Sequence, residues 1–236
     1  MNSEHPSGLN YFTPGMVPLA GLFPMTLASA LERYDLSLTT SQANQIESYC
    51  QLLWKWNEQI NLTRHTDYDR FVSRDLIDSM RLADLLEPNE GILDLGTGGG
   101  VPGIILAILR PDLEVSLCDS VAKKAKVVDK MVQDLTLPVP VYHARAEKLI
   151  GDFRFDTVIA RAVGSLAKVL GWLEPCWHSL QRLLLVKGPR WVEERAEARH
   201  RGLFRELELR RLVSYPMPGT DAESVILQIR RSISKI

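Results

Sequence analysis

From Gly91 to the C-terminus, short apolar runs alternate with longer segments that carry their apolar residues on one face. The short runs predict strands and the amphipathic segments predict helices. The predicted strands span residues 92–95, 114–119, 139–143, 156–160, 183–187, 209–215 and 225–230, and the predicted helices span residues 101–109, 121–135, 166–176 and 191–205. Residues 216–222 are too few for a crossover helix, so the last two strands should pair antiparallel. The pattern predicts an α/β fold whose seven-stranded, mostly parallel sheet ends in an antiparallel hairpin.

The segment before Gly91 has a different pattern. Residues 1–26 are rich in proline and glycine without periodicity, which is typical of a flexible extension. Apolar residues then recur at helical spacing, with Thr40 or Ser41 as the cap of a long helix and a second helix beginning near Asp67. We therefore expect an extension over residues 1–26, a helical appendage over 27–88 and a ligand-binding sheet domain over 89–236.

The composition narrows the class of protein. The 236 residues contain 28 Lys and Arg and 29 Asp and Glu, so any contact with nucleic acid must come from a local basic patch. No apolar run approaches the roughly 18 residues of a membrane span, and the first residues lack the basic segment of a signal peptide. The three cysteines form no C-x-x-C pair, which argues against disulfides and a zinc site. We expect a cytoplasmic protein without metal and without membrane contact.

A glycine-rich turn follows the first predicted strand. Asp94, Gly96, Gly98 and Gly100 occupy alternate positions, at the carboxyl end of a strand where open α/β sheets bind ligands. The spacing from Gly98 to Gly103 also satisfies the dinucleotide fingerprint, whereas a Walker A motif is excluded because no Lys-Ser or Lys-Thr follows. The acid two residues before the first glycine, the long preceding segment and the closing hairpin favour S-adenosylmethionine over NAD. A glycine-rich turn without a ligand is the remaining alternative.

Asp119 ends the second predicted strand, 23 residues after Gly96. Acids at about this spacing accept hydrogen bonds from ribose hydroxyls. Both S-adenosylmethionine and NAD contain such a diol, so Asp119 indicates an adenosine ligand without choosing between them. A solvated aspartate at the strand end is the alternative.

These residues, taken together, resemble the RsmG (GidB) family of small-subunit ribosomal RNA guanine-N7 methyltransferases. The resemblance extends from about Leu27 to the C-terminus. The matching segments are residues 94–103, 118–120 with 123–124, 144–147, 55–57, 61–63, 78–79, 160–162 and 187–188. Two positions differ from the family pattern: Gly99 stands where many relatives have proline, and Asp75 follows Arg74 where relatives commonly have histidine.

The resemblance implies a Rossmann-like, class I S-adenosylmethionine-dependent methyltransferase fold with a helical appendage. By matching position it places the cofactor against Gly96 and Val101, the adenine end near Ala146 and Glu147, and a further contact at Arg161. With Asp94, Gly98 and Asp119, these residues form the expected cofactor site. The implied substrate is a guanine of 16S ribosomal RNA near the decoding centre, in free RNA or in the assembling small subunit, and the protein is expected to be a monomer.

Methyl transfer to guanine N7 removes no proton from the acceptor, so we expect positioning by Arg161 rather than a general base. An ion pair at the sheet edge is the alternative role for Arg161. The turn after the fourth strand also lacks the Asn-Pro-Pro-Tyr-like motif of amine methyltransferases. An NAD-dependent oxidoreductase and a non-catalytic, S-adenosylmethionine-binding RNA chaperone remain alternatives for the whole chain.

Basic residues gather in two regions. Lys123, Lys124, Lys126 and Lys130 lie on one predicted helix, and residues 187–211 contain eight basic and five acidic side chains. Lys187 and Arg190 lie at the carboxyl end of the fifth predicted strand, at the expected rim of the site. We expect Lys187, Arg190, Lys123 and Lys124 to contact RNA. The histidines, including His65, show no metal-ligand spacing and are interpreted as structural or surface residues.

Overall fold

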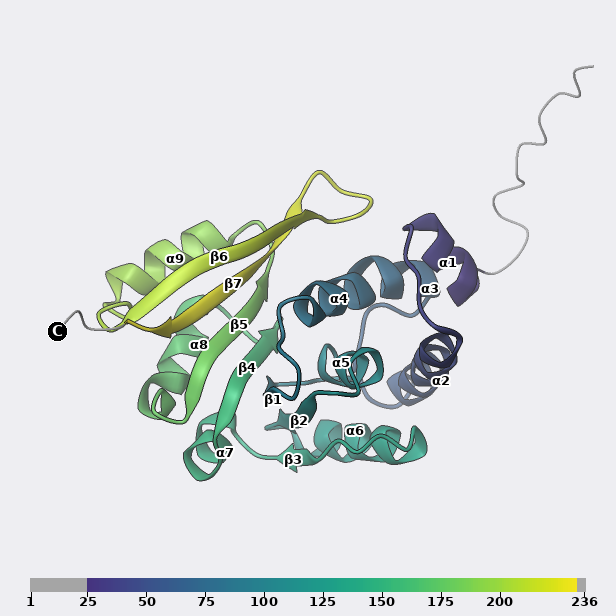
Figure 1. The fold of residues 1–236 in the computed structure, drawn as a ribbon, viewed down its shortest axis with the longest axis horizontal. Coiled ribbons are helices and arrows are strands. Elements are labelled where there is room, and N and C mark those ends of the chain that lie inside the picture. Colours follow the sequence, from purple (N-terminus) through teal and green to yellow (C-terminus); the bar gives the residue numbers. More distant parts are fainter. Residues whose placement is uncertain (1–24, 233–236) are drawn as a thin grey trace, which may run out of the picture.

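The structure is a computed structural model that describes residues 25–232, so most of the predicted extension lies outside the described residues. Seven strands form one sheet in the order β3-β2-β1-β4-β5-β7-β6 (Figure 1). All neighbours are parallel except the pairs that β7 makes with β5 and β6. The strands are β1 (Gly91–Leu95), β2 (Glu114–Asp119), β3 (Val141–His143), β4 (Phe155–Arg161), β5 (Leu180–Lys187), β6 (Leu207–Pro216) and β7 (Glu223–Arg231). The predicted parallel sheet with a closing antiparallel hairpin is confirmed.

Helices cover both faces of the sheet (Figure 1). One face carries α5 (Gly103–Leu109), α6 (Ala122–Asp134) and the N-terminal helices α1 (Leu27–Arg33), α2 (Thr40–Asn57), α3 (Tyr68–Arg70) and α4 (Ile77–Ala83). The other face carries α7 (Ala146–Asp152), α8 (Leu166–Leu173) and α9 (Trp191–His200). A π-helical turn (Phe71–Leu76) joins α3 to α4, and a 3₁₀ turn (Glu174–Cys176) follows α8.

The strands alternate between two cores because successive side chains point to opposite faces. Ile92 belongs to the core under the N-terminal helices, whereas the next residue, Leu93, belongs to the core under α7–α9. Tyr49 of α2 and Phe71 of the π-helical turn are fully buried in the first of these cores. The N-terminal helices therefore share a hydrophobic core with one face of the sheet.

Several element boundaries differ from the sequence predictions for identifiable reasons. Thr39, rather than Thr40 or Ser41, caps α2 in a reciprocal capping box with Gln42. The helix predicted over residues 166–176 ends at Leu173, since Pro175 cannot continue an α-helix. Gly202, with φ of 75°, follows the end of α9, which stops at His200 instead of residue 205. β3 is shorter than predicted because Pro138 and Pro140 have no N–H for the ladder.

The chain order of the strands places a crevice between β1 and β4. From β1 the chain proceeds outward to β2 and β3, and it then returns past β1 to β4 on the other side. In open α/β sheets this reversal leaves a crevice at the carboxyl ends of the two strands, where ligands bind. The crevice lies next to the glycine-rich turn that follows β1.

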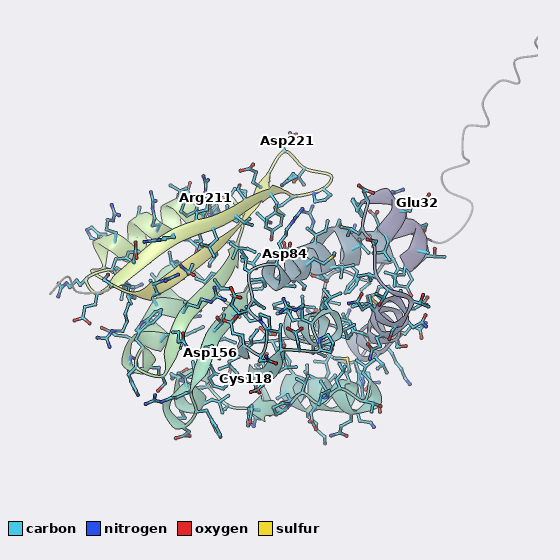
Figure 2. All side chains as sticks on the ribbon, viewed as in Figure 1. Glu32, Asp84, Cys118, Asp156, Arg211 and Asp221 are labelled. Atoms are coloured by element: carbon cyan, nitrogen blue, oxygen red, sulfur yellow. The ribbon has the colours of Figure 1, made fainter. Side chains whose placement is uncertain are left out.

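The tip of the β6–β7 hairpin, marked by Asp221, extends above α4 (Figure 2). Arg211 projects from the edge strand β6 into solvent in the same view. Met217 and Ser224, at the two sides of the hairpin tip, face the crevice. Within residues 25–232, we find no helix with the length and apolar character needed to span a bilayer.

Candidate functional site

The glycine-rich turn leads from β1 over the end of β2. The backbone N–H groups of Gly96 and Thr97 donate to the carbonyl of Cys118, at 2.9 and 3.0 Å. Gly98 has φ of 60° and open space where a side chain would begin, since the nearest atom to an added Cβ is 3.9 Å away. The turn therefore presents bare backbone to the cavity above it, which a ligand can approach closely.

Asp94 lies beneath this turn and does not line the cavity. Its Oδ2 accepts hydrogen bonds from Thr97 Oγ1 at 2.6 Å and from the N–H of Gly103 at 3.0 Å, while Oδ1 is buried without a partner in the described residues. Burial raises the pKa of Asp94 to about 6, although these two hydrogen bonds oppose the shift. The expected cofactor residue Asp94 thus shapes the turn from below.

Substitution of Asp94 by asparagine is expected to change how stability depends on pH. Because folding raises the pKa of Asp94 to about 6, protonation of this carboxyl favours folding, and the benefit is lost as pH rises through about 6. A shift of about two units corresponds to about 3 kcal/mol in total, most of which is lost between pH 4 and 7. Asp94→Asn should remove this part of the pH dependence. Urea unfolding of both proteins across that range measures it, and identical pH profiles would contradict the prediction.

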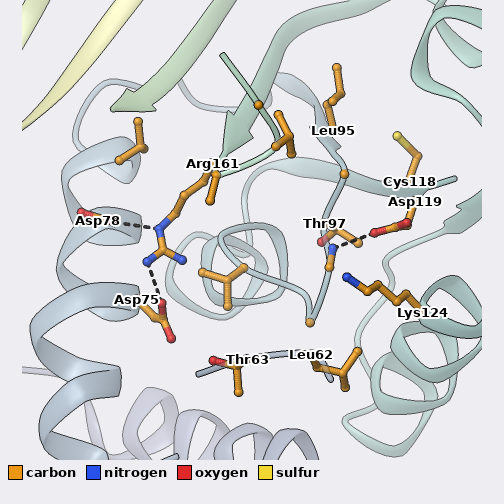
Figure 3. A pocket seen from close by; sticks show the side chains of 18 of the residues that line it. Leu62, Thr63, Asp75, Asp78, Leu95, Thr97, Cys118, Asp119, Lys124 and Arg161 are labelled. Carbon is orange, nitrogen blue, oxygen red and sulfur yellow. Dashed lines mark hydrogen bonds and ion pairs between the residues drawn. The ribbon is translucent and has the colours of Figure 1, made fainter. Parts of the chain in front are cut away.

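Asp119, at the end of β2, closes the turn from the other side. Its Oδ2 accepts from the N–H of Gly98 at 3.0 Å (Figure 3). Its Oδ1 accepts from the N–H of Val121 at 2.8 Å. The carboxylate lines the cavity, and each oxygen retains a lone pair for a further donor. Asp119 is therefore a hydrogen-bond acceptor that is fixed at the end of β2, in the position that the sequence predicted.

One cavity of about 1260 Å³ brings most of the predicted site residues together. Gly96, Gly98, Val101, Asp119, Ala146, Glu147, Arg161, Lys124 and Lys187 line it. The predicted residues Asp94, Lys123 and Arg190 do not. α7, which the sequence analysis did not predict as a helix, supplies Ala146 and Glu147.

Arg161 ends β4 and is held between two aspartates (Figure 3). Its Nε donates to Asp78 Oδ2 at 2.7 Å, and its Nη2 lies 2.7 Å from Asp75 Oδ1. The third nitrogen, Nη1, points away from both carboxylates and has no hydrogen-bond partner in the described part of the chain. Burial alone would lower the pKa of Arg161, but the charges of Asp75 and Asp78 raise it above its usual value. The guanidinium is fixed, permanently charged and left with one free edge.

The π-helical turn explains how both aspartates reach Arg161. Asp75 lies in the wider π turn and Asp78 in the first turn of α4, so that both carboxylates face the end of β4. Turns of this kind occur often at functional sites. Tyr215 of β6 donates to Asp78 Oδ1 at 2.7 Å, which ties the closing hairpin to the same cluster.

His65 belongs to this cluster, contrary to its interpretation as a lone structural or surface residue. Its Nδ1 lies 2.9 and 3.0 Å from the two oxygens of Asp75, and the ring lines the cavity. The backbone of His65 is held as well, since its N–H donates to Thr63 Oγ1 and its carbonyl accepts from Trp54 Nε1. Neither spacing nor composition signals this contact, because it depends on the loop after α2 folding back onto the π-helical turn.

The helix α2 supports the glycine-rich turn from behind. The hydroxyl of Tyr49 donates to the carbonyl of Gly99 at 2.8 Å, and this contact is fully buried. A Cβ at Gly99 would lie 2.9 Å from the end of the Leu53 side chain, so a larger residue there requires that side chain to shift. The N-terminal helices therefore set the position of the turn that faces the cavity.

Lys187 at the end of β5 is already engaged within the protein. Its ammonium donates to the carbonyl of Gly164 and to Glu194 Oε2, the latter at 2.8 Å, and only 11% of the side chain is exposed. The carboxylate of Glu194 also accepts from the N–H of Leu166, the first residue of α8. Lys187 thus joins the turns after β4 and β5 at the rim of the cavity.

The matching family model and the curated relatives point to one family. The family model described as "GidB: rRNA small subunit methyltransferase G" matches residues 42–218. The ribosomal RNA small subunit methyltransferase G of Rhodopirellula baltica is 56% identical over 83% of this chain and 84% of its own length. The protein of the same name from Pseudomonas aeruginosa is 32% identical over 87% of this chain and 94% of its own length. Among solved structures, TrmN from Thermus thermophilus matches 66% of this chain and 48% of its own, with a TM-score of 0.49 and 20% identity.

Proposed function

Because the chain belongs to the GidB family of small-subunit ribosomal RNA methyltransferases, we propose that it transfers a methyl group from S-adenosylmethionine to N7 of a guanine in 16S ribosomal RNA near the decoding centre. One observation carries the proposal. Arg161, which two carboxylates hold in place, lines the same cavity as the glycine-rich turn, whose backbone is open to that cavity. The cavity has room for both a cofactor and a nucleobase, and the two features lie on neighbouring strands.

The residues of the cavity fit S-adenosylmethionine. Gly98 leaves open the space that a Cβ would fill, and Asp119 offers its remaining lone pairs to a ribose diol. Gly96 and Val101 would contact the cofactor beside the turn, and Ala146 and Glu147 would contact its adenine end. When bound, S-adenosylmethionine supplies an electrophilic methyl group carried on a sulfonium.

The charges around Arg161 suit a reaction that makes the acceptor cationic. Asp75 and Asp78 carry two negative charges against one on the guanidinium, so the cluster has a surplus carboxylate beside the cavity. Methylation at N7 leaves a positive charge on the guanine base, and fixed charges of opposite sign stabilise such a developing charge. The free Nη1 of Arg161 could meanwhile hold the O6 edge of the base. These residues align and stabilise the base without removing a proton.

The RNA is proposed to enter over the rim of the cavity. Lys124 lines the cavity, Lys123 is exposed one residue earlier on α6, and Arg190 is exposed just before α9. Their positive charges can neutralise backbone phosphates. The ammonium of Lys187 is already paired with Glu194. We therefore propose that Lys187 mainly holds the rim of the cavity in place and that its contact with RNA is secondary.

Mass spectrometry of nucleosides from 16S ribosomal RNA, with and without this gene, tests the proposal. Loss of one N7-methylguanosine in the deletion strain, restored by the parent gene, is the expected result. The purified protein should also transfer labelled methyl groups to 16S RNA or to immature small subunits in vitro. RNA binding without transfer would favour the chaperone alternative, and an unchanged nucleoside profile would refute the proposed target.

Tyr49→Phe is expected to weaken cofactor binding several-fold while leaving the fold intact. The variant loses one buried hydrogen bond to Gly99, worth about 1 kcal/mol, from behind the turn that faces the cofactor. Calorimetric titration with S-adenosylmethionine measures the change. Tyr34→Phe, which loses a hydrogen bond to Asp69 far from the turn, is the control and should bind as the parent does. Equal affinities of the two variants for S-adenosylmethionine would show that α2 does not support the cofactor site.

A further inference from the structure

A second groove, of about 460 Å³, lies between the C-terminal end of α9 and the start of β6. None of its lining residues lines the cavity of the candidate site. Three arginines and an aromatic ring dominate it, above two leucines of the edge strand: Arg195, Arg199, Arg205, Phe204, Leu207 and Leu209. The groove therefore combines guanidinium groups with an apolar floor.

The three arginines of this groove have no carboxylate partner in the described residues, whereas their neighbours do. Three nearby glutamates each form an ion pair with an arginine outside the groove: Glu197 with Arg201, Glu208 with Arg210, and Glu206 with Arg231. Of the described residues, Glu208 alone brings a carboxylate to the lining of the groove, and Arg210 holds it at 2.8 Å. Within residues 25–232, the positive charge of the groove is thus uncompensated although carboxylates lie nearby.

Two simpler accounts cover only part of this arrangement. Basic residues at the end of a helix interact favourably with its dipole, which accounts for Arg199 in the last turn of α9. That effect decays within one turn, so it does not account for Arg195 or for Arg205, which lies beyond the helix. Phe204 is half-buried: it packs against the core under α7–α9, and it also lines the groove beside the arginines, where solvated charges need no aromatic neighbour.

We propose that this groove is a second RNA contact, in which Arg195, Arg199 and Arg205 hold backbone phosphates and Phe204 stacks on an unpaired base. Arginine and aromatic side chains together are the usual means of holding single-stranded RNA. The inference rests on the proposed RNA substrate. α9 begins at the rim of the cavity and its ten residues span about 15 Å, so the groove holds the RNA a few nucleotides away from the target base.

Salt dependence of RNA binding tests the inference with two matched triple variants. The groove variant replaces Arg195, Arg199 and Arg205 by glutamine, and the control replaces the paired Arg201, Arg210 and Arg231. Both lose three positive charges from the same end of the protein. The affinity for a 16S RNA fragment is measured over a series of salt concentrations, together with the melting temperature and the affinity for S-adenosylmethionine.

The groove variant should bind RNA about tenfold more weakly, and its slope of log K against log salt should fall by about 2, as expected when two or three phosphate contacts are lost. The control variant should keep the parental slope, and cofactor affinity and melting temperature should not change in either. Phe204→Leu should weaken binding to a single-stranded fragment several-fold without altering the slope, since stacking involves no counterion release. Parental slopes in the groove variant, or equal losses in both triple variants, would overturn the inference.

The same measurements separate this inference from the proposed function. If the parent transfers methyl groups to 16S RNA and the groove variant keeps the parental slope, only the inference fails. If the parent binds RNA with the expected slope but transfers no methyl group, only the proposed function fails. A groove variant that binds free RNA as the parent does, yet is inactive on assembling subunits, would refute the RNA contact and indicate an acidic protein surface as the occupant.

Discussion

Gly98→Asp is expected to reduce the affinity for S-adenosylmethionine by about a hundredfold or more while the protein stays folded. A Cβ at Gly98 would meet no protein atom closer than 3.9 Å, so the new side chain can occupy the space above the turn that the ligand needs. Its charge would also lie near the carboxylate of Asp119, which accepts from the N–H of residue 98, and would repel it. The backbone cost of φ at 60° is about 1 kcal/mol, which a folded domain tolerates.

Gly219→Asp is the matched control for this variant. Gly219 also has positive φ, at 76°, and open space around an added Cβ, but it lies in the turn between β6 and β7. The two variants therefore carry similar backbone strain and the same added charge. Calorimetric titration with the cofactor and thermal unfolding should separate them, with loss of binding in Gly98→Asp alone. Parental affinity in Gly98→Asp would show that the turn does not contact the cofactor.

The sheet was predictable from the sequence because its central strands are mostly buried on both faces and its strands are bounded by turn residues. Ile92 and Leu93, for example, enter different cores, so the whole run is apolar. α7 escaped prediction because it has seven residues, includes Gly151 and begins without a side-chain cap. Local propensity alone is therefore too weak to predict this helix, and its packing against α8 and the 3₁₀ turn stabilises it.

The site residues that lie at strand ends were predictable from the sequence. The contacts that depend on the packing of distant segments were less predictable. The glycine turn and Asp119 follow directly from strand ends, and the sequence placed both in the cavity. By contrast, the π-helical register that aims Asp75 at Arg161 has no signature in the spacing of residues. The pairing of Lys187 with Glu194 across two elements was equally hidden, which is why Lys187 was expected to be free for RNA.

Arg161→Lys is expected to slow methyl transfer by about tenfold or more at saturating cofactor and RNA. Lysine keeps the charge but lacks the planar fork that now holds Asp75 and Asp78 while leaving Nη1 free. One amine cannot hold both carboxylates and also present a fixed donor to the base, so alignment should suffer more than binding. Single-turnover rates measure the chemical step. Tyr215→Phe, which removes a hydrogen bond to Asp78 without touching the guanidinium, should cost much less.

The pH dependence of the same single-turnover rate separates positioning from general base catalysis. The carboxylates beside Arg161 raise its pKa, so it stays protonated and cannot accept a proton at neutral pH. If guanine N7 attacks unaided, the rate should show no essential ionisation of a protein base between about pH 6 and 9.

His65 is the side chain that decides between the two mechanisms. Its Nδ1 contacts the carboxylate of Asp75 beside the cavity, and a carboxylate orients a histidine in this way where the histidine acts as a general base. His65→Gln should therefore leave the pH profile flat. A titration in the parent that disappears in His65→Gln would indicate proton transfer to His65 instead of unaided attack, and near-parental activity in Arg161→Lys would contradict positioning by the planar guanidinium.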